Sequence, residues 1–289
     1  MGKTIINILG AGRSGTTMLD LILGSDNESF SMGEVCAWFR PFREHHFTID
    51  CNCGNPKCKY WLALKGVDES KFYTHAFTKW NVKYIIDSSK NLSWMIDGHS
   101  WAKKQNIEVI NFIIYKPIID YIFSIWKRGE SVDAALYRYK LYYKRFFESG
   151  IDAYAVNFDE LVNNTDTMLD VITDITKQPK VENRHQFWVK EHHHLFGSGG
   201  TRNQAKEGES KIKTKESFPE EFVKQIPDFK NRIERDKQLS RILLKLEQID
   251  VKEKNRQPNH GIRKPLWYYY LKIHNRFKTK FPSSSKTKF

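Results

Sequence analysis

A glycine-rich loop close to the N-terminus constrains the fold of this chain more than any other feature. The apolar, β-branched run Thr4 to Leu9 leads directly into this loop, and an amphipathic stretch follows it. The spacing is that of G-x-x-x-x-G-K-[ST], in which backbone N–H groups and a helix N-terminus bind one phosphate. The order of strand, loop and helix argues against the interpretation of this loop as a chance glycine-rich turn. We therefore expect a phosphate site at Gly12, Arg13, Ser14, Gly15, Thr16 and Thr17.

One position of the loop departs from that motif. Thr16 stands where nucleoside-triphosphate proteins carry a lysine, the cation that bridges the β- and γ-phosphates. Without this lysine the loop still suits a terminal phosphate, so the expected ligand carries a single 5′-phosphate-like group. A nucleotide kinase or hydrolase is the competing enzyme class, and Thr16 argues against it.

Four apolar runs predict the strands of a buried parallel sheet, because they are short and rich in β-branched residues. The segments between them carry apolar residues three or four positions apart, which is typical of helices that cover a sheet. This alternation predicts right-handed crossovers and a doubly wound α/β fold, a parallel sheet with helices on both faces. The expected strands are Thr4 to Leu9, Val82 to Ile86, Val109 to Tyr115 and Ala153 to Phe158, and the expected helices are Thr17 to Leu23, Leu92 to Gln105, Tyr121 to Trp126 and Ala134 to Phe147.

The length of 289 residues fits one large domain. We expect this domain over residues 1–250, with an insertion at about 39–77, where Cys, Gly, Pro and His alternate without a period. The polar stretch 197–216 predicts a loop. Residues 222–249 predict one or two surface helices, with a break at Pro227.

Positive charge is concentrated in a basic, aromatic C-terminal segment, residues 251–289. The chain has a formal net charge of +13, and from residue 250 onward eleven Lys or Arg face only Asp250 and Glu253. We interpret Leu266 to Phe277, with its aromatic stripe, as a core-packing or partner-docking helix in preference to a membrane-surface helix. A basic tail also suits anionic glycan or lipid, so a non-catalytic binder of an anionic polymer is the alternative from another functional class.

Hydropathy gives the expected location. No stretch approaches the roughly 20 apolar residues that span a bilayer, and Ile5 to Leu9 is too short for a signal-peptide core. We expect a cytoplasmic protein without a transmembrane segment, whose basic C-terminus offers at most peripheral membrane contact. Nucleic acid is not an expected partner.

The four cysteines lie close together in the sequence. In a reducing compartment this pattern predicts free thiols or a metal rather than disulfides. Cys51, Cys53 and Cys58 have a spacing compatible with zinc, with His46 or Cys36 as the fourth ligand. The paired C-x-x-C sequences of many zinc sites are missing, so we favour buried or free thiols and expect no metal.

The loop resembles the 5′-phosphosulfate loop of a known enzyme family. Arg13-Ser14-Gly15-Thr16-Thr17 is similar to the loop of carbohydrate, tyrosylprotein and many bacterial sulfotransferases. The resemblance implies transfer of a sulfuryl group from 3′-phosphoadenosine 5′-phosphosulfate (PAPS) to an acceptor hydroxyl, favouring a carbohydrate or another small alcohol. Adenosine 3′,5′-bisphosphate (PAP) would be the product, and no metal would be required. Gly33-Glu34 stands where the family has Gly-Glu, which implies that Glu34 is the general base.

Later motifs extend the resemblance to about residue 204. Asp87-Ser88-Ser89-Lys90 looks like the family's Asp-Ser-Ser-Lys, which implies that Lys90, with Arg13, contacts the sulfuryl group or the bridging oxygen. The segment Lys116 to Ser124 has the spacing of Arg-Asp-Pro-Arg-x-Val-x-x-Ser, whose Arg and Ser bind the 3′-phosphate. Lys116 replaces the arginine, so a point charge would stand in for a bidentate fork. Arg202 ends a segment similar to His-x-x-x-Gly-Asn-x-x-Arg and would reach the same phosphate.

Each of these residues also has a plainer interpretation, since exposed lysines and surface carboxylates are common. We favour function because Glu34, Lys90 and Lys116 are expected at the carboxyl ends of strands or just past the loop helix, where open α/β sheets bind ligands. His45 and His46 are the alternative source of a base.

Overall fold

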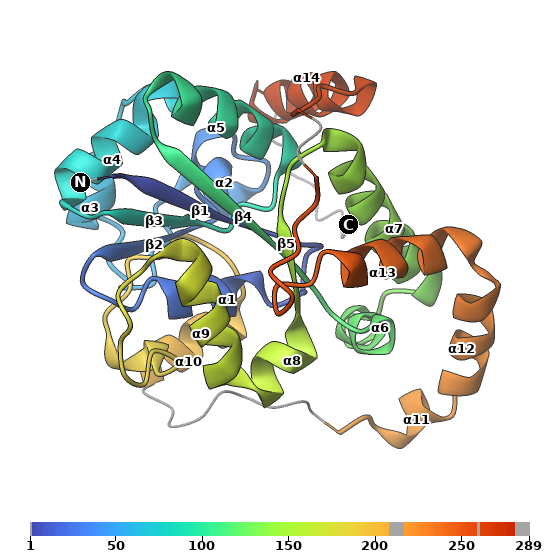
Figure 1. Cartoon of the computed structure of the whole chain (residues 1–289). Helices are drawn as coiled ribbons and strands as arrows, with labels where there is room; N and C mark the ends of the chain where they lie inside the picture. The colour runs from blue at the N-terminus through green and yellow to red at the C-terminus, as the bar shows by residue number, and fades with distance from the viewer. Residues whose placement is uncertain (1, 208–216, 259–260, 281–289) are drawn as a thin grey trace.

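The structure, a computed structural model of the chain, describes residues 2–207, 217–258 and 261–280. Its centre is a parallel sheet in the order β2-β3-β1-β4-β5 (Figure 1). The longest pairing joins β1 and β4, from Thr4 opposite Glu108 to Leu9 opposite Ile113. The strands are β1 Thr4–Leu9, β2 Ser29–Gly33, β3 Tyr84–Asp87, β4 Glu108–Tyr115 and β5 Tyr154–Asn157.

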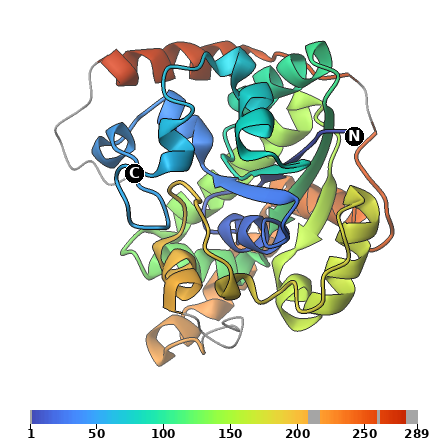
Figure 2. The ribbon, with the colours of Figure 1, turned by 90° about the vertical axis from the view of Figure 1, so that its left-hand side faces the viewer.

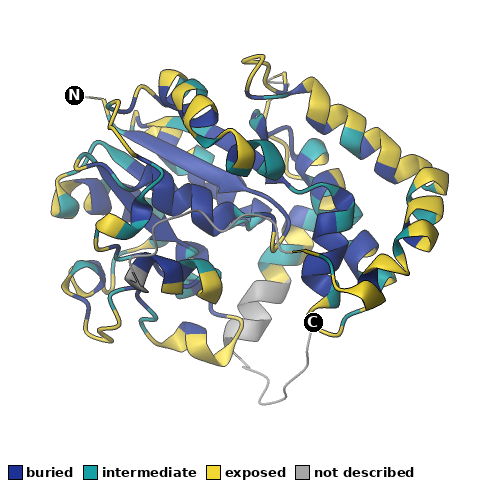
Figure 3. Cartoon of the chain, turned by 90° about the horizontal axis from the view of Figure 1, so that it is seen from below, coloured by how far each residue is buried: buried dark blue, intermediate teal, exposed yellow. Residues whose placement is uncertain are grey.

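Helices cover both faces of the sheet because each strand contributes apolar side chains to both. Successive residues of a strand point to opposite faces. In β1, Ile6 and Ile8 therefore pack in one core, while Ile5 and Leu9 pack in the other. Figure 3 shows the strands buried and the outer faces of many helices exposed.

The face that contains Ile6 and Ile8 is covered by helices from both halves of the chain. Met18 and Ile22 of the first helix pack there together with Met168. The elements on this side are α1 Thr16–Leu23, α8 Phe158–Asn163, α9 Thr165–Thr176, the 3-10 turn η3 Phe187–Val189 and α10 Gly199–Glu207 (Figure 1).

The opposite face carries the larger core, which is rich in aromatic side chains such as Trp94 and Tyr139. The helices that pack there are α2 Val35–Phe39, α3 Lys59–Leu62, α4 Phe72–Trp80, α5 Leu92–Lys104, α6 Ile118–Trp126 and α7 Val132–Ser149, with the 3-10 turns η1 Glu44–Phe47 and η2 Glu69–Lys71. Further out lie α11 Glu220–Val223, α12 Ile226–Arg235, α13 Lys237–Gln248 and α14 Leu266–Lys280. None of the helices in the described part of the chain is long and apolar enough to cross a lipid bilayer.

Side-chain caps fix where several helices begin. The Asn91 side chain accepts from the amide of Trp94 at the start of α5, and Ser131 does the same for Ala134 at the start of α7. Such caps satisfy amides that have no partner within the helix. The helix α7 ends at Gly150, which has a positive φ of 68°.

The C-terminal helix α14 lies along the α5 side of the sheet (Figures 1 and 2). Tyr268 is buried, and its hydroxyl donates to Asp97 Oδ1 of α5 at 2.5 Å. Tyr269, Tyr270 and Ile273 of the same helix are exposed. The aromatic stripe of this segment is thus divided between the core and the surface.

The doubly wound α/β class is confirmed, with the four expected strands and the four expected helices between them. The structure adds β2, whose sequence Ser-Phe-Ser-Met-Gly has no β-branched residue. Phe30 and Met32 of this strand pack in the larger core, and the buried Ser29 and Ser31 hydroxyls bond to Asp26 at 2.7 Å and His194 at 2.6 Å.

Two expectations about the second half of the chain were wrong in detail. Residues 199–207, expected as part of a loop, form α10, while 208–216 lie outside the described residues. Between 220 and 248 there are three helices. Pro227 lies in the first turn of α12, where its missing amide costs nothing, and Asp236 separates α12 from α13.

Candidate active site at the carboxyl ends of the strands

A cavity of about 770 Å³ lies at the carboxyl edge of the sheet. Residues that follow each of the five strands line it. The chain leaves β1 toward β2 on one side, and it later passes from β3 across β1 to β4 on the other. This is the switch point at which open α/β sheets bind ligands. The lining residues that follow the strands are Ala11, Gly12 and Arg13 after β1, Glu34 after β2, Ser89 and Lys90 after β3, Lys116 after β4, and Phe158 and Asp159 after β5.

The phosphate loop passes from β1 into α1 through a left-handed turn at Gly15, where φ is 99°. A side chain at this position would place its Cβ 2.2 Å from the Phe158 ring, so glycine is required. Gly12, Arg13, Gly15, Thr16 and Thr17 line the cavity. Within the described residues no side chain caps the start of α1. The first amides of this helix therefore suit an anion.

Arg13 lies on the cavity wall with a positive φ of 80°. Its Nη1 donates to Ser198 Oγ at 3.3 Å, and the Ser198 amide donates to Thr17 Oγ1 at 3.1 Å. Burial, and then the charge of Arg128, lower the pKa of Arg13. The turn at Ser198 thus holds the outer side of the phosphate loop.

Two tyrosines of α7 form hydrogen bonds with the loop. The Tyr142 hydroxyl accepts from the Gly10 amide at 3.0 Å and donates to the Lys90 carbonyl at 2.9 Å. The Tyr143 hydroxyl donates to the Ile114 carbonyl at 2.9 Å and lies 3.3 Å from Ser14 Oγ. Ser14 is fully buried by this contact, and its place is behind the cavity wall. Neither tyrosine was predicted as part of the site, because the sequence does not indicate what two adjacent aromatic residues of a helix contact.

Glu34 and Lys90 meet across the cavity as an ion pair between the Lys90 ammonium and Glu34 Oε1. Their side chains are only 21% and 16% exposed, so water screens the pair weakly. The Glu34 amide donates to the Leu195 carbonyl at 2.9 Å. Lys90 has a positive φ of 59°, an unfavourable backbone conformation for lysine. Such backbone conformations cluster at functional sites, and Arg13 shares this one.

Asp20 of α1, which was not predicted from the sequence, positions the backbone beside Glu34 and Lys90. It is completely buried, and its Oδ2 accepts from the Gly33 amide at 3.1 Å and from Ser88 Oγ at 2.5 Å. Burial raises the pKa of Asp20 to about 7. The carboxyl group thereby holds the residue before Glu34 and the turn before Lys90 in one place.

Lys116 and Ser124 also line the cavity, and Lys116 lies beside Phe158, whose ring packs against Gly15 of the phosphate loop. The Lys116 ammonium lies 4.3 Å from the centre of the Phe158 ring, and burial lowers its pKa to about 8, with a further contribution from Arg13. Ser124 donates to the Asp120 carbonyl at 2.9 Å. Over the whole described lining, eight Lys or Arg side chains face four Asp or Glu, a surplus that suits an anionic ligand.

Arg202 is placed differently from the other predicted residues. Its guanidinium binds the Asp50 carboxylate through Nη1 and Nη2, at 2.9 and 2.8 Å. Its neighbours Gly200, Thr201 and Gln204 line the cavity instead. Arg128 also lines the cavity, although no motif pointed to it.

The two alternative bases lie outside the described cavity lining. His46 is buried between Phe42 and Phe196, and burial lowers its pKa to about 3. His45 stacks edge-on against His46. The lining carboxylate at Glu34 is better placed to act as a base.

The cysteines form a cluster whose fourth member was not expected. Cys51, Cys53, Cys58 and His193 bring their ligand atoms within 4.8 Å of one another. Cys36 lies elsewhere, with its amide bonded to Ser89, and His46 packs against Phe196. Both earlier candidates for a fourth ligand were therefore wrong. His193 comes from a segment far along the chain, so local spacing could not identify it.

Comparison with known proteins gives matches in structure. No protein-family model and no curated protein sequence matches this chain. The sulfotransferase domain from the Synechococcus PCC 7002 olefin synthase matches with a TM-score of 0.53 and 13% identity, over 79% of this chain and 95% of that one. The sulfotransferase domain from the curacin biosynthetic pathway matches with a TM-score of 0.51 and 15% identity, over 79% and 98%. These similarities show that the chain shares the fold of sulfotransferase domains.

Proposed function

We propose that this protein is a sulfotransferase that moves a sulfuryl group from PAPS to a hydroxyl group of an acceptor. The observation that carries the proposal is the arrangement of one cavity. A phosphate loop with threonine at the triphosphate lysine position shares that cavity with the Glu34–Lys90 ion pair. The fold shared with two sulfotransferase domains supports the same conclusion. Sulfuryl transfer needs the phosphate loop and the ion pair in one cavity. The sulfur atom lies between the bridging oxygen of the donor, which leaves, and the hydroxyl oxygen of the acceptor, which attacks.

In this proposal the donor's 5′-phosphate binds at the start of α1. The amides of Gly15, Thr16 and Thr17 would bind its oxygens. Lys116 and Ser124, which line the same cavity, would bind the 3′-phosphate, with Arg128 as an additional cation. Arg202 would act indirectly in this arrangement, since Asp50 holds its guanidinium.

The proposed chemistry is an in-line displacement at sulfur. Glu34 accepts the proton of the acceptor hydroxyl while the hydroxyl oxygen forms a bond to sulfur. The bond between sulfur and the bridging oxygen breaks, and PAP leaves. Lys90 and Arg13 stabilise the negative charge that develops on the bridging oxygen. A positioned base of this kind typically contributes about 10²- to 10⁴-fold to the rate.

The ion pair gives Lys90 two successive partners. In the protein alone the Lys90 ammonium pairs with the Glu34 carboxylate. In the proposed reaction the ammonium turns toward the leaving oxygen while Glu34 takes the proton. One cation would thus serve both reacting groups.

Substitution of the proposed base tests this function. Glu34→Gln should lower transfer from PAPS to a mixed panel of glycans, lipids and phenols by about 10²- to 10⁴-fold, with products detected by mass spectrometry. PAP affinity, measured by calorimetry, should stay close to that of the wild type, because the base acts on the acceptor. Glu44→Gln, at an exposed site outside the described cavity lining, is the matched control.

Other outcomes would reject the proposal. Normal turnover in Glu34→Gln would remove this residue from the mechanism. Thermal stabilisation by ATP with magnesium, without stabilisation by PAP, would favour a kinase or nucleotide hydrolase. A carbohydrate remains our favoured acceptor, and sulfation of phenols alone would correct it.

A further inference from the structure

We propose that Cys51, Cys53, Cys58 and His193 bind a structural zinc ion that fastens the 39–77 insertion to the segment beside Glu34. Three sulfur atoms and one imidazole nitrogen lie within 4.8 Å of one another. Three thiolates and one histidine are a common ligand set of structural zinc sites. The cluster is separate from the described cavity lining, so its chemistry differs from the one proposed for sulfuryl transfer.

Three of the six distances between the ligand atoms are close to those of a tetrahedral site, and all six are within 4.8 Å. Zinc–sulfur bonds of about 2.3 Å at tetrahedral angles place two sulfurs about 3.7 Å apart, and a sulfur and a nitrogen about 3.5 Å apart. Here the sulfurs of Cys51 and Cys53 are 3.3 Å apart. His193 Nδ1 lies 3.4 Å from the Cys58 sulfur and 3.9 Å from the Cys51 sulfur.

Contacts around His193 hold its ring in the orientation that a ligand needs. The ring stacks on Tyr60 with centroids 4.0 Å apart, and the His193 carbonyl accepts from Trp61 Nε1 at 2.7 Å. Its Nδ1 faces the thiols, while Nε2 lies 3.8 Å from a Glu191 carboxylate oxygen. Zinc-binding histidines usually direct their second nitrogen to such a carboxylate or carbonyl group.

The environment indicates a structural rather than a catalytic ion. Cys51 and Cys58 are each only 2% exposed, and the His193 side chain is 14% exposed. Four protein ligands complete a tetrahedron, whereas catalytic zinc keeps one position open for water or substrate. The ion would cross-link parts of the chain that are 142 residues apart, counted from Cys51 to His193.

This cross-link would stabilise the backbone that carries the proposed base. The Asn52 amide donates to the His194 carbonyl at 2.8 Å, next to the two ligands. The following residue, Leu195, pairs with both sides of Gly33: its amide donates to Met32 at 3.1 Å, and its carbonyl accepts from Glu34 at 2.9 Å. Loss of zinc should therefore loosen the turn at Glu34. This consequence for catalysis rests on the proposed function, whereas zinc binding itself does not.

Metal analysis of the full chain tests the site. Protein purified without a histidine tag should contain about one zinc per chain by plasma mass spectrometry. Cys58→Ser and His193→Ala should lose most of it, and His193→Cys should keep it, since four thiolates also bind zinc. Cys36→Ser is the matched control, because this buried cysteine lies outside the cluster and should leave the zinc content unchanged.

Cobalt substitution of the wild-type protein keeps the test decisive if the variants fail to fold. Cobalt bound at the site should give thiolate charge-transfer and tetrahedral d–d absorption bands, and metal removal should lower the thermal unfolding midpoint. A folded wild-type chain without zinc and without these cobalt bands would overturn the proposal. So would a disulfide between Cys51 and Cys53, seen as a mass lower by two hydrogens. Glu34→Gln should keep its zinc, so failure of the proposed function would be distinguishable from failure of the metal site.

Discussion

Lys116 is a half-buried cation whose charge depends on its surroundings. The ammonium lies over the Phe158 ring and near Arg13, and its pKa is lowered to about 8. It is therefore protonated below pH 8 and becomes increasingly neutral above that value. A bound phosphate stabilises the protonated form, so binding takes up a proton at high pH.

We expect PAP affinity to be nearly constant below about pH 8 and to fall above it, by at most about tenfold per pH unit. The measurement is titration calorimetry over a pH series that passes through 8. Lys116→Arg should keep its affinity at high pH, because arginine stays protonated. If the wild type and Lys116→Arg gave the same flat profile, Lys116 would not bind the phosphate.

The element that connects the two halves of the cavity is α7, through Tyr142. This hydroxyl joins the start of the phosphate loop at Gly10 to the turn at Lys90. Neither of these backbone groups belongs to α7. The helix therefore sets the distance between the donor loop and the proposed reacting groups.

Tyr142→Phe should weaken PAP binding by about tenfold or more, because the Gly10 amide and the Lys90 carbonyl lose the hydroxyl that holds them together, and each unsatisfied group that stays buried costs about 1–3 kcal/mol. Calorimetry of PAP binding measures the effect. Tyr137→Phe, on the exposed side of the same helix, is the control and should leave the affinity unchanged. Equal affinities in the two variants would show that α7 does not hold the loop.

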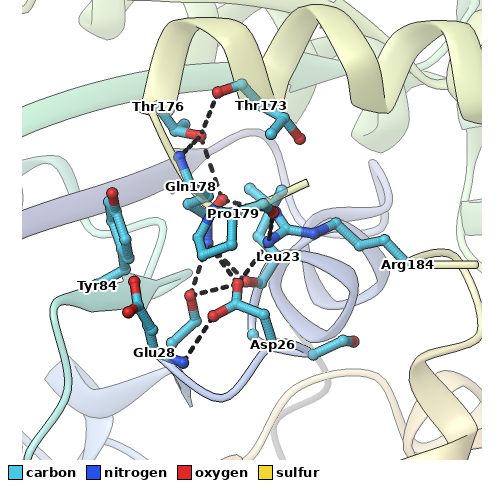
Figure 4. A network of polar contacts seen from close by, with 12 residues as sticks. Leu23, Asp26, Glu28, Tyr84, Thr173, Thr176, Gln178, Pro179 and Arg184 are labelled. Atoms are coloured by element: carbon cyan, nitrogen blue, oxygen red, sulfur yellow. Dashed lines mark hydrogen bonds and ion pairs between the residues drawn. The ribbon is translucent and has the colours of Figure 1, made fainter. Parts of the chain in front are cut away.

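At the scale of the whole molecule, a buried polar network joins the end of α1 to the segment that follows α9 (Figure 4). Arg184 Nη2 pairs with Asp26 Oδ2 at 2.5 Å, and their side chains are only 4% and 2% exposed. Gln178 donates to the Leu23 carbonyl at 2.9 Å and to Ser29 Oγ at 2.7 Å. The network thus anchors the start of β2 through Ser29.

Arg184→Ala should lower the free energy of unfolding by about 3–5 kcal/mol, because it leaves the buried Asp26 carboxylate without its cation. Urea denaturation measures this loss. Lys180→Ala is the control, since its side chain is 69% exposed and its ion pair should contribute about 0–1 kcal/mol. A loss no larger than that of the control would mean that Asp26 is satisfied without Arg184.

Residue patterns within short segments predicted the elements of this protein that depend on residues close together in the sequence. Four strands, the helices between them and the phosphate loop follow from periodicity and from a glycine turn, each within a few consecutive residues. Motifs of the same kind placed Lys90 after a strand and Glu34 just past the loop helix, whereas the strand that directly precedes Glu34 was not expected. β2 was missed because it is short and has no β-branched residue, with Phe30 and Met32 as its apolar side chains, while hydrogen bonds to Asp26 and His194 satisfy its serines.

The sequence by itself determined the fold class, the position of the loop and nine of the residues that line the cavity, among them Glu34, Lys90 and Lys116. Only the tertiary structure paired Glu34 with Lys90, bonded Asp20 and Tyr142 to the backbone beside them, and brought His193 to the cysteines. The physical reason is separation along the chain. Backbone periodicity is set by near neighbours, whereas these contacts join residues that only crossovers of the sheet bring together.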